Sequence, residues 1–572
     1  MSVRTIRTDI LILGSGGAGL FAALHAKKAA PNLSVTIAVK GLLGKCGCTR
    51  MVQGGYNVAL APGDSIERHF MDTIEGGKWL PDQDLAWTLV TKAIERIHEL
   101  ENELGCFFDR NPDGTVHQKA FAGQTFDRTV HKGDLTGIEI INRLAEQVWV
   151  SGVERLEEHR AVELVKSADG ALAGALMIDM REGDFVFVQA RAVLLGTGGG
   201  PTMYRYHTPS GDKSCDGLAM ALRSGLTLRD MEMVQFHPTG LLAGPGTRMT
   251  GTVLEEGLRG AGGYLLDGSR ERFMSRYDAR NERATRDVVS RAIFAEMREG
   301  RSTPNGGVYL AMSHLGADSV RKQFKGMVDR CRDCGFDLAA GLVEVVPTAH
   351  YMMGGVEFAP DGRTALEGLF AAGEDTGGVH GANRLGGNGV ANSTVFGAIA
   401  GDAMAAWVGS ADFRDPLPGA VEAARARAAR PVGRAPGDIE SIREALYAVM
   451  WDDVGILRDE GGLSRGHDRL LELRESLEKC GVSGGDLRYN LTWHDWLNME
   501  SLISVSLAIC RAAQARTDSR GAHFREDFPE TGDLAASAFS CVTQRRESDE
   551  LDVTWKPVRF TRVKPGQSLI AA

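Results

Sequence analysis

The sequence predicts an α/β protein in which a Rossmann-like dinucleotide-binding domain is split by an inserted α+β capping domain. A helical domain and a C-terminal tail domain are expected to follow. Three observations lead to this fold class. A glycine-rich turn, Gly14–Gly19, separates an apolar strand from an amphipathic helix. Two later apolar segments, Ala192–Leu195 and Leu369–Ala372, also run into glycines, and a long helical pattern comes after them.

The first element pair carries the strongest local signal. Asp9–Leu13 is predicted to be a strand, a helix is predicted to run to about Ala30, and Val35–Val39 is the next predicted strand. A GxGxxG turn at this place allows a dinucleotide diphosphate to lie on the helix N-terminus. The second strand ends at Val39-Lys40 without the acidic ribose-binding residue that is typical of NAD sites. We therefore favour a dinucleotide other than a nicotinamide cofactor.

The remaining patterns set the expected domain boundaries. The dinucleotide-binding domain is predicted to comprise residues 1–240 and 355–415, because its later strands lie on both sides of a mixed segment. That segment, residues 241–354, is the predicted capping domain. Residues 416–518 are predicted to be helical, with charged stripes such as Arg469–Lys479 on solvated faces. The tail, residues 519–572, is turn-rich and is expected to contain short strands.

Composition excludes several classes of function. The chain has 572 residues, more than one core usually holds, and a formal net charge of -10, which argues against a nucleic-acid partner. Its 71 glycines fall in short clusters, which suggests backbone lying close to a large ligand. The nine cysteines are scattered and odd in number, so we expect a reducing compartment and no disulfide framework. Cys331-x-x-Cys334 has no second pair at metal spacing, and no metal site is expected.

No targeting or membrane-spanning pattern is present in the sequence. The N-terminus shows no basic-then-apolar leader, and no apolar run reaches the ~18 residues of a membrane span. We expect a cytoplasmic location, with attachment to the cytoplasmic face of a membrane only through partner subunits.

One glycine-rich stretch points to a substrate. His380–Asn388 places a single cation, Arg384, among glycines far downstream of the first turn. A planar guanidinium in such a segment is suited to bind a carboxylate with two parallel hydrogen bonds. The expected ligand is an acid lying against the cofactor.

Five separated motifs are present along the chain: Gly14-x-Gly-Gly-x-Gly19, Gln53-Gly54-Gly55, Gln235–Gly240, Pro347–Gly355 and His380–Asn388. In order and content they resemble those of one known family, the flavoprotein subunit of succinate dehydrogenase and fumarate reductase, with L-aspartate oxidase as a near relative. The resemblance covers nearly the whole chain, including Ser519–Asp527.

The resemblance implies that the dinucleotide-binding domain is an FAD-binding domain. Gly14, Gly16 and Gly19 admit the diphosphate, and Asp216 and Glu374 match the family's acidic contacts to FAD. Without the family context, Asp216 could be no more than a loop cap. The cofactor-binding residues that the resemblance implies are Gly14, Gly16, Gly17, Gly19, Lys40, Gly47, Cys48, Thr49, Gly54, Gly55, Thr197, Asp216, Glu374, Gly389 and Val390.

The resemblance also implies a C4 dicarboxylate substrate. His237, His350 and Arg384 match the family's substrate contacts, and Phe121 would cover the substrate and exclude water. Outside a family motif, either histidine alone would be read as a hydrogen-bonded core residue.

Proton transfer at the substrate carbon is assigned by the resemblance to Arg286. Gln235, Glu256 and Arg259 match the relay that reloads this arginine, whose pKa above ~12 would otherwise make it a poor acid. In this scheme a hydride moves between flavin N5 and one substrate carbon while Arg286 exchanges a proton at the neighbouring carbon. From the sequence alone, Arg286 could equally be a salt-bridged helix residue.

Two positions depart from the family pattern. The respiratory family carries FAD covalently on a histidine where this chain has Cys48, so histidyl attachment at this position is impossible. We expect non-covalent FAD, with a cysteinyl linkage at Cys48 as the alternative. Glu255 stands where both relatives usually have threonine, and the loop between His237 and Glu256 is longer than usual. Glu255 keeps an amino or imino acid open as the substrate, although Phe121 stands where aspartate oxidases have the glutamate that binds the substrate ammonium.

The sequence therefore predicts FAD-dependent interconversion of succinate and fumarate by a flavoprotein subunit with an iron–sulfur partner. The chain has no cysteine clusters of its own for iron–sulfur centres. Two alternatives stay open: a self-contained, L-aspartate oxidase-like enzyme acting on an amino dicarboxylate, and a non-catalytic or RNA-modifying FAD module.

Overall fold

A seven-stranded sheet organises the amino-terminal part of the computed structural model, which describes residues 2–244, 247, 249–545 and 548–570. The strand order is β6-β2-β1-β9-β8-β7, and β16 pairs with β9 at its end. β1, β2, β6, β9 and β16 pair in parallel, whereas β7 and β8 are antiparallel. The strands are β1 (Val3–Leu13), β2 (Val35–Val39), β6 (Glu154–Glu157), β7 (His159–Lys166), β8 (Leu172–Asp179), β9 (Asp184–Leu195) and β16 (Leu369–Ala371).

The central elements of this sheet lie where the sequence predicts them. The strand Val35–Val39 is confirmed, and the first helix, α1, spans Gly17–Ala29. β1 begins at Val3 rather than Asp9, because its polar first half pairs with β9 from Val3 opposite Phe185. That half has mostly exposed or half-buried side chains, so it lacks the apolar run that marks Ile10–Leu13. The predicted strand ends at Leu195 and near Ala372 are confirmed by β9 and β16.

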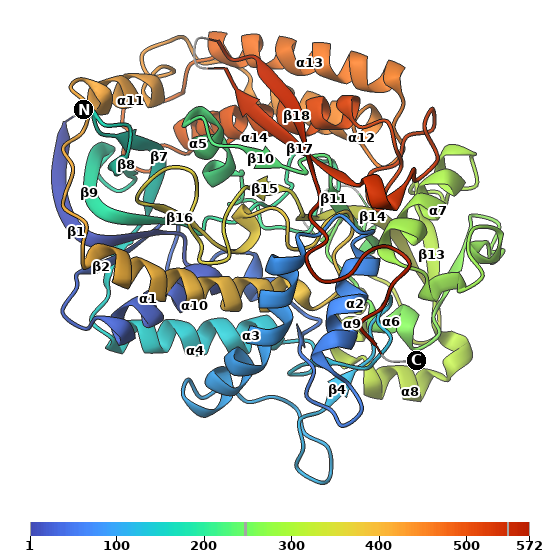
Figure 1. Ribbon diagram of the computed structural model, residues 1–572. Helices are drawn as coiled ribbons and strands as arrows, with labels where there is room; N and C mark the ends of the chain where they lie inside the picture. The colour runs from blue at the N-terminus through green and yellow to red at the C-terminus, as the bar shows by residue number, and fades with distance from the viewer. Residues whose placement is uncertain (1, 245–246, 248, 546–547, 571–572) are drawn as a thin grey trace.

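Helices cover one face of this sheet, as Figure 1 shows. α1 packs against the longest of them, α10 (Asn388–Val408), with α3 (Gln83–Asn102) and α4 (Thr136–Val150) beside the pair. Two glycines of α10 allow this close approach. A Cβ at Gly397 would lie 2.5 Å from the carbonyl oxygen of Ala18, and one at Gly401 would lie 2.4 Å from that of Ala22. Because α1 and α10 both begin at the candidate site, their packing fixes two of its walls.

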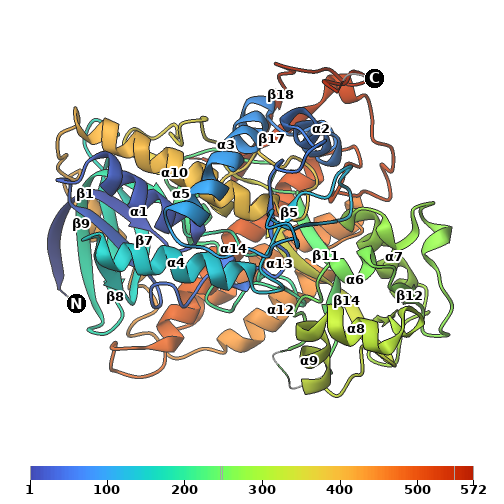
Figure 2. The same ribbon diagram turned by 90° about the horizontal axis from the view of Figure 1, so that it is seen from below.

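A second sheet, with its own helices, forms the cap at one end of the molecule (Figures 1 and 2). Its order is β11-β14-β13-β12, and all three pairings are antiparallel. The boundary predicted at residue 240 falls inside β11. The elements are β11 (Val234–Leu241), β12 (Tyr264–Leu266), β13 (Val308–Ala311), β14 (Leu342–Met352), α6 (Gly257–Gly260), α7 (Arg286–Arg298), α8 (Ala317–Gln323) and α9 (Lys325–Asp333).

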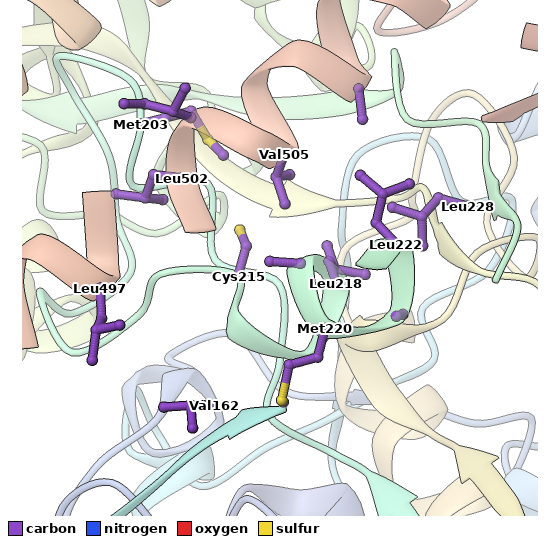
Figure 3. Close-up of a cluster of buried hydrophobic side chains, with 14 of the residues drawn as sticks. Val162, Met203, Cys215, Leu218, Met220, Leu222, Leu228, Leu497, Leu502 and Val505 are labelled. Carbon is purple, nitrogen blue, oxygen red and sulfur yellow. The ribbon is translucent and has the colours of Figure 1, made fainter. Parts of the chain in front are cut away.

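The predicted helical segment folds as four helices on the side of the main sheet opposite α1 and α10 (Figure 1). The longest, α14 (Leu491–Ala515), packs on the short helix α5 (Asp216–Arg223). Figure 3 shows Leu497, Leu502 and Val505 of α14 in the same apolar cluster as Leu218 of α5. This packing holds the start of α5 in place. The other helices are α11 (Ala420–Ala428), α12 (Ile439–Asp452) and α13 (Glu460–Lys479).

The tail returns to the amino-terminal part through a third sheet of order β15-β10-β17-β18. A buried ion pair reinforces this junction, since Arg516 Nε donates to Glu232 Oε1 at 2.6 Å and Ser540 Oγ donates to the same carboxylate at 2.7 Å. The strands are β10 (Leu228–Arg229), β15 (Gly355–Val356), β17 (Ala538–Gln544) and β18 (Leu551–Pro557). Three short strands, β3 (Tyr56–Asn57), β4 (Gln118–Lys119) and β5 (Thr129–Val130), form a small fourth sheet, and α2 (Ile66–Gly76) precedes α3.

Three further observations concern the described residues. All nine cysteines are free. Within the described ranges, no three His, Cys, Asp or Glu side chains are grouped so that they could hold a metal ion. None of the helices traced there combines the length and apolar character needed to cross a membrane.

The α1–α10 contact generates a stability prediction. Gly397→Ala should lower the free energy of unfolding by about 1–3 kcal/mol, because the added methyl group meets the backbone of α1. Urea unfolding measures the change. Gly485→Ala is the control, since a Cβ there has no neighbour within 4 Å. Equal stability of the two variants would contradict the close packing.

Candidate active site

A hollow of about 1310 Å³ lies where the main sheet, the cap and the starts of α1 and α10 meet. Glycines line much of its wall, among them Gly16, Gly54, Gly198 and Gly389. A second hollow of about 580 Å³ continues from it past the carboxyl ends of β1 and β2. In open parallel sheets, ligands bind at this edge.

The first glycine turn is shaped by close backbone contacts. Gly14 has φ +108°, and a Cβ there would lie 2.2 Å from the carbonyl oxygen of Gly196. A Cβ at Gly19 would lie 2.0 Å from the carbonyl oxygen of Gly14. Gly16 has no side chain to cap α1, and among the described residues only the amide of Gly17 donates to a side chain near this helix start, to Thr49 Oγ1 at 3.1 Å. The uncapped helix start faces the hollow and suits an anion.

Asp216 lines the second hollow and is held by three side chains. Its carboxylate accepts from Arg160 Nη2 at 2.8 Å, from Lys40 Nζ at 3.1 Å and from Ser501 Oγ at 3.0 Å. Burial alone would raise its pKa, but Arg160 and Lys40 hold the pKa of Asp216 well below its ordinary value. A charged acceptor at the end of β2 is therefore available, although it comes from α5 and not from β2 itself.

Glu374 and Cys48 face the first hollow as neutral or weakly acidic groups. Glu374, in the turn after β16, accepts from the amides of Gly200 at 3.2 Å and Met352 at 3.0 Å. Burial raises the pKa of Glu374 to about 7. Burial, and then the nearby Glu374, raises the pKa of the Cys48 thiol to about 12. Cys48 is therefore a protonated thiol near neutral pH, which is a weak nucleophile.

Arg384 lies at the other end of the hollow, immediately before α10. Its guanidinium stacks over the Tyr351 ring, 4.4 Å from the centroid, and Nη1 donates to the carbonyl of Leu385 at 3.3 Å. Its buried Nε has no hydrogen-bond partner, and among the described residues it forms no ion pair. Burial, and then Arg286, lowers the pKa of Arg384 to about 10. It is a buried cation without an anion, which is costly unless a ligand supplies one.

Two histidines complete this end. The rings of His237, on β11, and His350, on β14, lie with centroids 5.5 Å apart. His237 Nδ1 accepts from the amide of Thr239 at 3.3 Å, which leaves Nε2 as the donor, and His350 Nδ1 is 2.8 Å from Thr208 Oγ1. Burial, and then Arg286, keeps the pKa of both imidazoles well below the ordinary value. Both are neutral hydrogen-bonding groups.

Arg286 starts α7 and meets its predicted relay. Its Nη2 and Nε donate to Glu256 Oε2 at 2.7 and 3.1 Å, and its Nη1 donates to Gln235 Oε1 at 3.1 Å. Arg259 Nη2 donates to the other Glu256 oxygen at 3.0 Å. Burial opposes ionisation of Glu256, but the two arginines hold its pKa below the ordinary value. Gln235 Nε2 also donates to the carbonyl of Arg384 at 2.7 Å, which links the predicted relay to Arg384.

Phe121 and Glu255 close the hollow on the cap side. The Phe121 ring lies between Gly54 and Gly386, where added Cβ atoms would come within 2.6 and 2.5 Å of it. Glu255, with a side chain 9% exposed, pairs with Lys119 Nζ at 3.3 Å. Burial raises the pKa of Glu255, and Lys119 opposes that rise. Lys119 therefore compensates the charge of Glu255, the residue that departs from the family pattern at this position.

The structure brings most of the predicted residues to the two hollows. Gly19, Gln235 and Arg259 stand behind the walls, Gly19 in strand–helix packing and the other two in the relay. The expected residues that line a hollow are Gly14, Gly16, Gly17, Lys40, Gly47, Cys48, Thr49, Gly54, Gly55, Phe121, Thr197, Asp216, His237, Glu255, Glu256, Arg286, His350, Glu374, Arg384, Gly389 and Val390. The predicted long loop after His237 includes residues 245, 246 and 248, which lie outside the described residues.

Sequence reasoning missed four residues that matter to the geometry. Tyr351 follows His350 inside the Pro347–Gly355 motif, so that motif could have revealed it. Lys213 lies three residues before Asp216, so the match at Asp216 could have revealed it. Thr208 and Arg160 carry no local signal, because only the fold places them beside His350 and Asp216.

Comparison with known proteins identifies the family. A family profile described as FAD binding domain matches residues 9–390, and one described as Fumarate reductase flavoprotein C-term matches residues 443–569. The chain belongs to the fumarate reductase and succinate dehydrogenase flavoprotein family. It is 41% identical to one subunit of the fumarate reductase (CoM/CoB) of Methanothermobacter marburgensis, over 91% of this chain and 95% of that one.

Two further members of the flavoprotein family support this assignment. The 8-methylmenaquinol:fumarate reductase flavoprotein subunit of Wolinella succinogenes is 35% identical, over 97% of this chain and 91% of that one. A solved mutant of the FrdA chain of E. coli quinol fumarate reductase superposes with a TM-score of 0.92 at 32% identity, covering 99% of both chains.

The residues present fit FAD, the cofactor of this flavoprotein family. The uncapped start of α1 and the close glycine contacts at Gly14 leave room and polarity for a diphosphate. At the start of α10, a Cβ on Gly389 would press within 3.1 Å of Arg384 Nη1, so a side chain at this position would crowd the guanidinium. Bound there, FAD supplies or accepts a hydride at flavin N5.

Glu374 generates a pH prediction. Because the folded protein holds a proton up to about pH 7 that the unfolded chain releases near pH 4.5, Glu374 should reduce stability as pH rises through this window. Glu374→Gln can keep both amide contacts and should remove roughly 3 kcal/mol of this pH dependence, at about 1.4 kcal/mol per pKa unit. Urea unfolding of the flavin-free wild type and variant at both ends of the window measures it. Identical pH slopes would contradict the assignment.

Proposed function

We propose that this chain catalyses the FAD-dependent interconversion of succinate and fumarate. The observation that carries the proposal is the charge of the hollow at the substrate end. Arg384 contributes one positive charge, and the Arg286–Glu256–Arg259 group contributes one more, since it contains two arginines and one glutamate. The Lys119–Glu255 pair and the two neutral histidines add none. A dicarboxylate dianion balances this charge.

In the proposed reaction, different side chains bind the substrate and transfer the proton. In this proposal Arg384 and His350 bind one carboxylate, His237 binds the other, and Phe121 covers the carbons between them and excludes water; all four side chains line the same hollow. Binding both ends fixes the orientation of the two central carbons, which is worth several kcal/mol in a reaction between held groups. Arg286 borders the same space and exchanges a proton at one of these carbons. Glu256 holds the guanidinium in place and, with Gln235 and Arg259, restores its proton.

Arg286 generates the first functional prediction. Arg286→Gln should lower turnover of both succinate and fumarate by about 10²–10⁴-fold, because the proton donor is removed. FAD should remain bound, since the hydrogen bonds of Arg286 go to Glu256 and Gln235 and not to the start of α1. Dye-coupled assays in both directions, with the flavin absorption spectrum, measure the two effects. Arg298→Gln on the exposed face of the same helix is the control, and unchanged turnover in Arg286→Gln would restore the non-catalytic FAD module.

A second candidate is an L-aspartate oxidase-like enzyme, which Glu255 favours because a carboxylate could bind the substrate ammonium. The ion pair with Lys119 weighs against it, since that carboxylate already has a cation at 3.3 Å.

The pair Lys119 and Glu255 separates the two candidates. Lys119→Met should raise the KM for succinate about tenfold, because it exposes an unpaired carboxylate near a dianion. Glu255→Gln should keep kcat for succinate near the wild-type value and should not raise the KM, because the lysine left behind adds positive charge beside a dianion. Steady-state assays with succinate and L-aspartate, including peroxide detection, provide the measurement. Wild-type activity with L-aspartate alone, lost in Glu255→Gln, would establish the second candidate instead.

We also propose that the electrons leave through a partner subunit that carries iron–sulfur centres, and that FAD is held without a covalent bond. The relatives named above are described as subunits of larger enzymes. The protonated Cys48 thiol supports non-covalent binding. We further propose a cytoplasmic location with any membrane contact through partners. Acid denaturation that releases all yellow colour from the polypeptide, and co-purification of an iron–sulfur protein, test the first two statements.

A further inference from the structure

The two hollows meet at five residues that line both of them, and one of these residues is charged. The residues that line both hollows are Gly16, Gly47, Thr197, Gly198 and Lys213. Gly16 is the uncapped start of α1. Of these five residues, only Lys213 carries a charge, and an extended dinucleotide that fills both hollows must pass it.

Lys213 is held in a fixed position. Its amide donates to the carbonyl of Ser210 at 3.0 Å, and its own carbonyl accepts from Thr202 Oγ1 at 2.7 Å. Its aliphatic stem crosses Gly200, where a Cβ would come within 2.7 Å of the Lys213 Cβ. Its Nζ donates to the carbonyl of Thr197 at 2.9 Å. Cβ atoms built on Gly47 and Gly198 would each lie 3.7 Å from Nζ, so glycines keep the space around the ammonium open.

The ammonium has no anionic partner in the described part of the chain. The neighbouring cations differ, since Lys40 and Arg160 both form ion pairs with Asp216. The acidic and thiol groups around Lys213 are Asp212, Glu374, Cys46 and Cys48, and none forms an ion pair with it. Asp212 bonds Ser210 and Glu374 accepts two backbone amides. A partly buried cation without an anion implies that a ligand supplies one.

We propose that Lys213 binds the diphosphate of FAD, on the side opposite the N-terminus of α1. A lysine binds phosphate as a compact point charge, and here its position is set before the ligand arrives. The helix start and the ammonium together would compensate the diphosphate charge from two directions. The inference rests on the FAD site and not on which dicarboxylate is turned over, so failure of one leaves the other intact.

The test compares flavins that differ in phosphate content. In the full-length protein, Lys213→Met should weaken FAD binding about ten- to a hundredfold, the range for hydrogen bonds to charged groups. It should also make FAD binding less sensitive to salt. Riboflavin, which has no phosphate, should bind wild type and variant equally, and FMN should fall between them. Flavin fluorescence titration measures all three constants.

Three variants make the outcome decisive. Lys213→Arg should restore FAD binding to within about threefold, because it keeps the charge. Lys213→Gln keeps a donor for the Thr197 carbonyl and replaces Lys213→Met if the latter fails to fold. Lys45→Met removes an exposed lysine nearby and should change nothing. The proposal is overturned if Lys213→Gln binds FAD as wild type does, if riboflavin loses affinity as much as FAD, or if only the flavin midpoint potential changes.

Discussion

Unpaired positive charge in a closed space is the constraint on which this site depends. Arg384 and Lys213 are both held rigidly, and neither has an anionic partner among the described residues. Their charges are tolerated because glycine walls keep room for anions beside them. The other cations around the hollows, Lys40, Arg160 and Arg286, are paired with protein carboxylates. The division separates the cations that already have an anion within the protein from the two that have none in the part that the structure describes.

The packing of the fold produces this arrangement. The parallel strands β1, β9 and β16 end at one edge, and α1 and α10 start there because their glycines allow the two helices to touch. The cap then brings Arg286, Glu256 and His237 to the opposite wall from elements that lie far along the chain from the first glycine turn. Gln235 joins the two parts, since its side chain bonds both Arg286 and the carbonyl of Arg384. The residues proposed for proton transfer and for substrate binding therefore share one hydrogen-bonded frame.

Much of this was predictable from sequence where a backbone rule applies locally. The β1–α1–β2 unit, the strand ends at Leu195 and Ala371 and the helical segment follow from apolar runs that end in glycine or in helical periodicity. The polar first half of β1 was missed because its pairing with β9 is a long-range effect. The family resemblance supplied the site residues and the relay around Arg286, but not the partners of Asp216 and Glu255. Arg160 beside Asp216 and Lys119 beside Glu255 are separated by 56 and 136 positions, and only the fold brings them together.

The Lys119–Glu255 ion pair has a consequence for how such a site can evolve. The charge of each member is compensated only while the other is present, because either one alone adds a charge beside the substrate. A lineage that changes one residue passes through a state with altered substrate affinity before the second change restores balance. The two positions should therefore co-vary among homologues. A homologue with an uncharged residue at one position should have an uncharged residue at the other. Substitutions at positions 119 and 255 are therefore coupled, and substrate preference would change through pairs of substitutions.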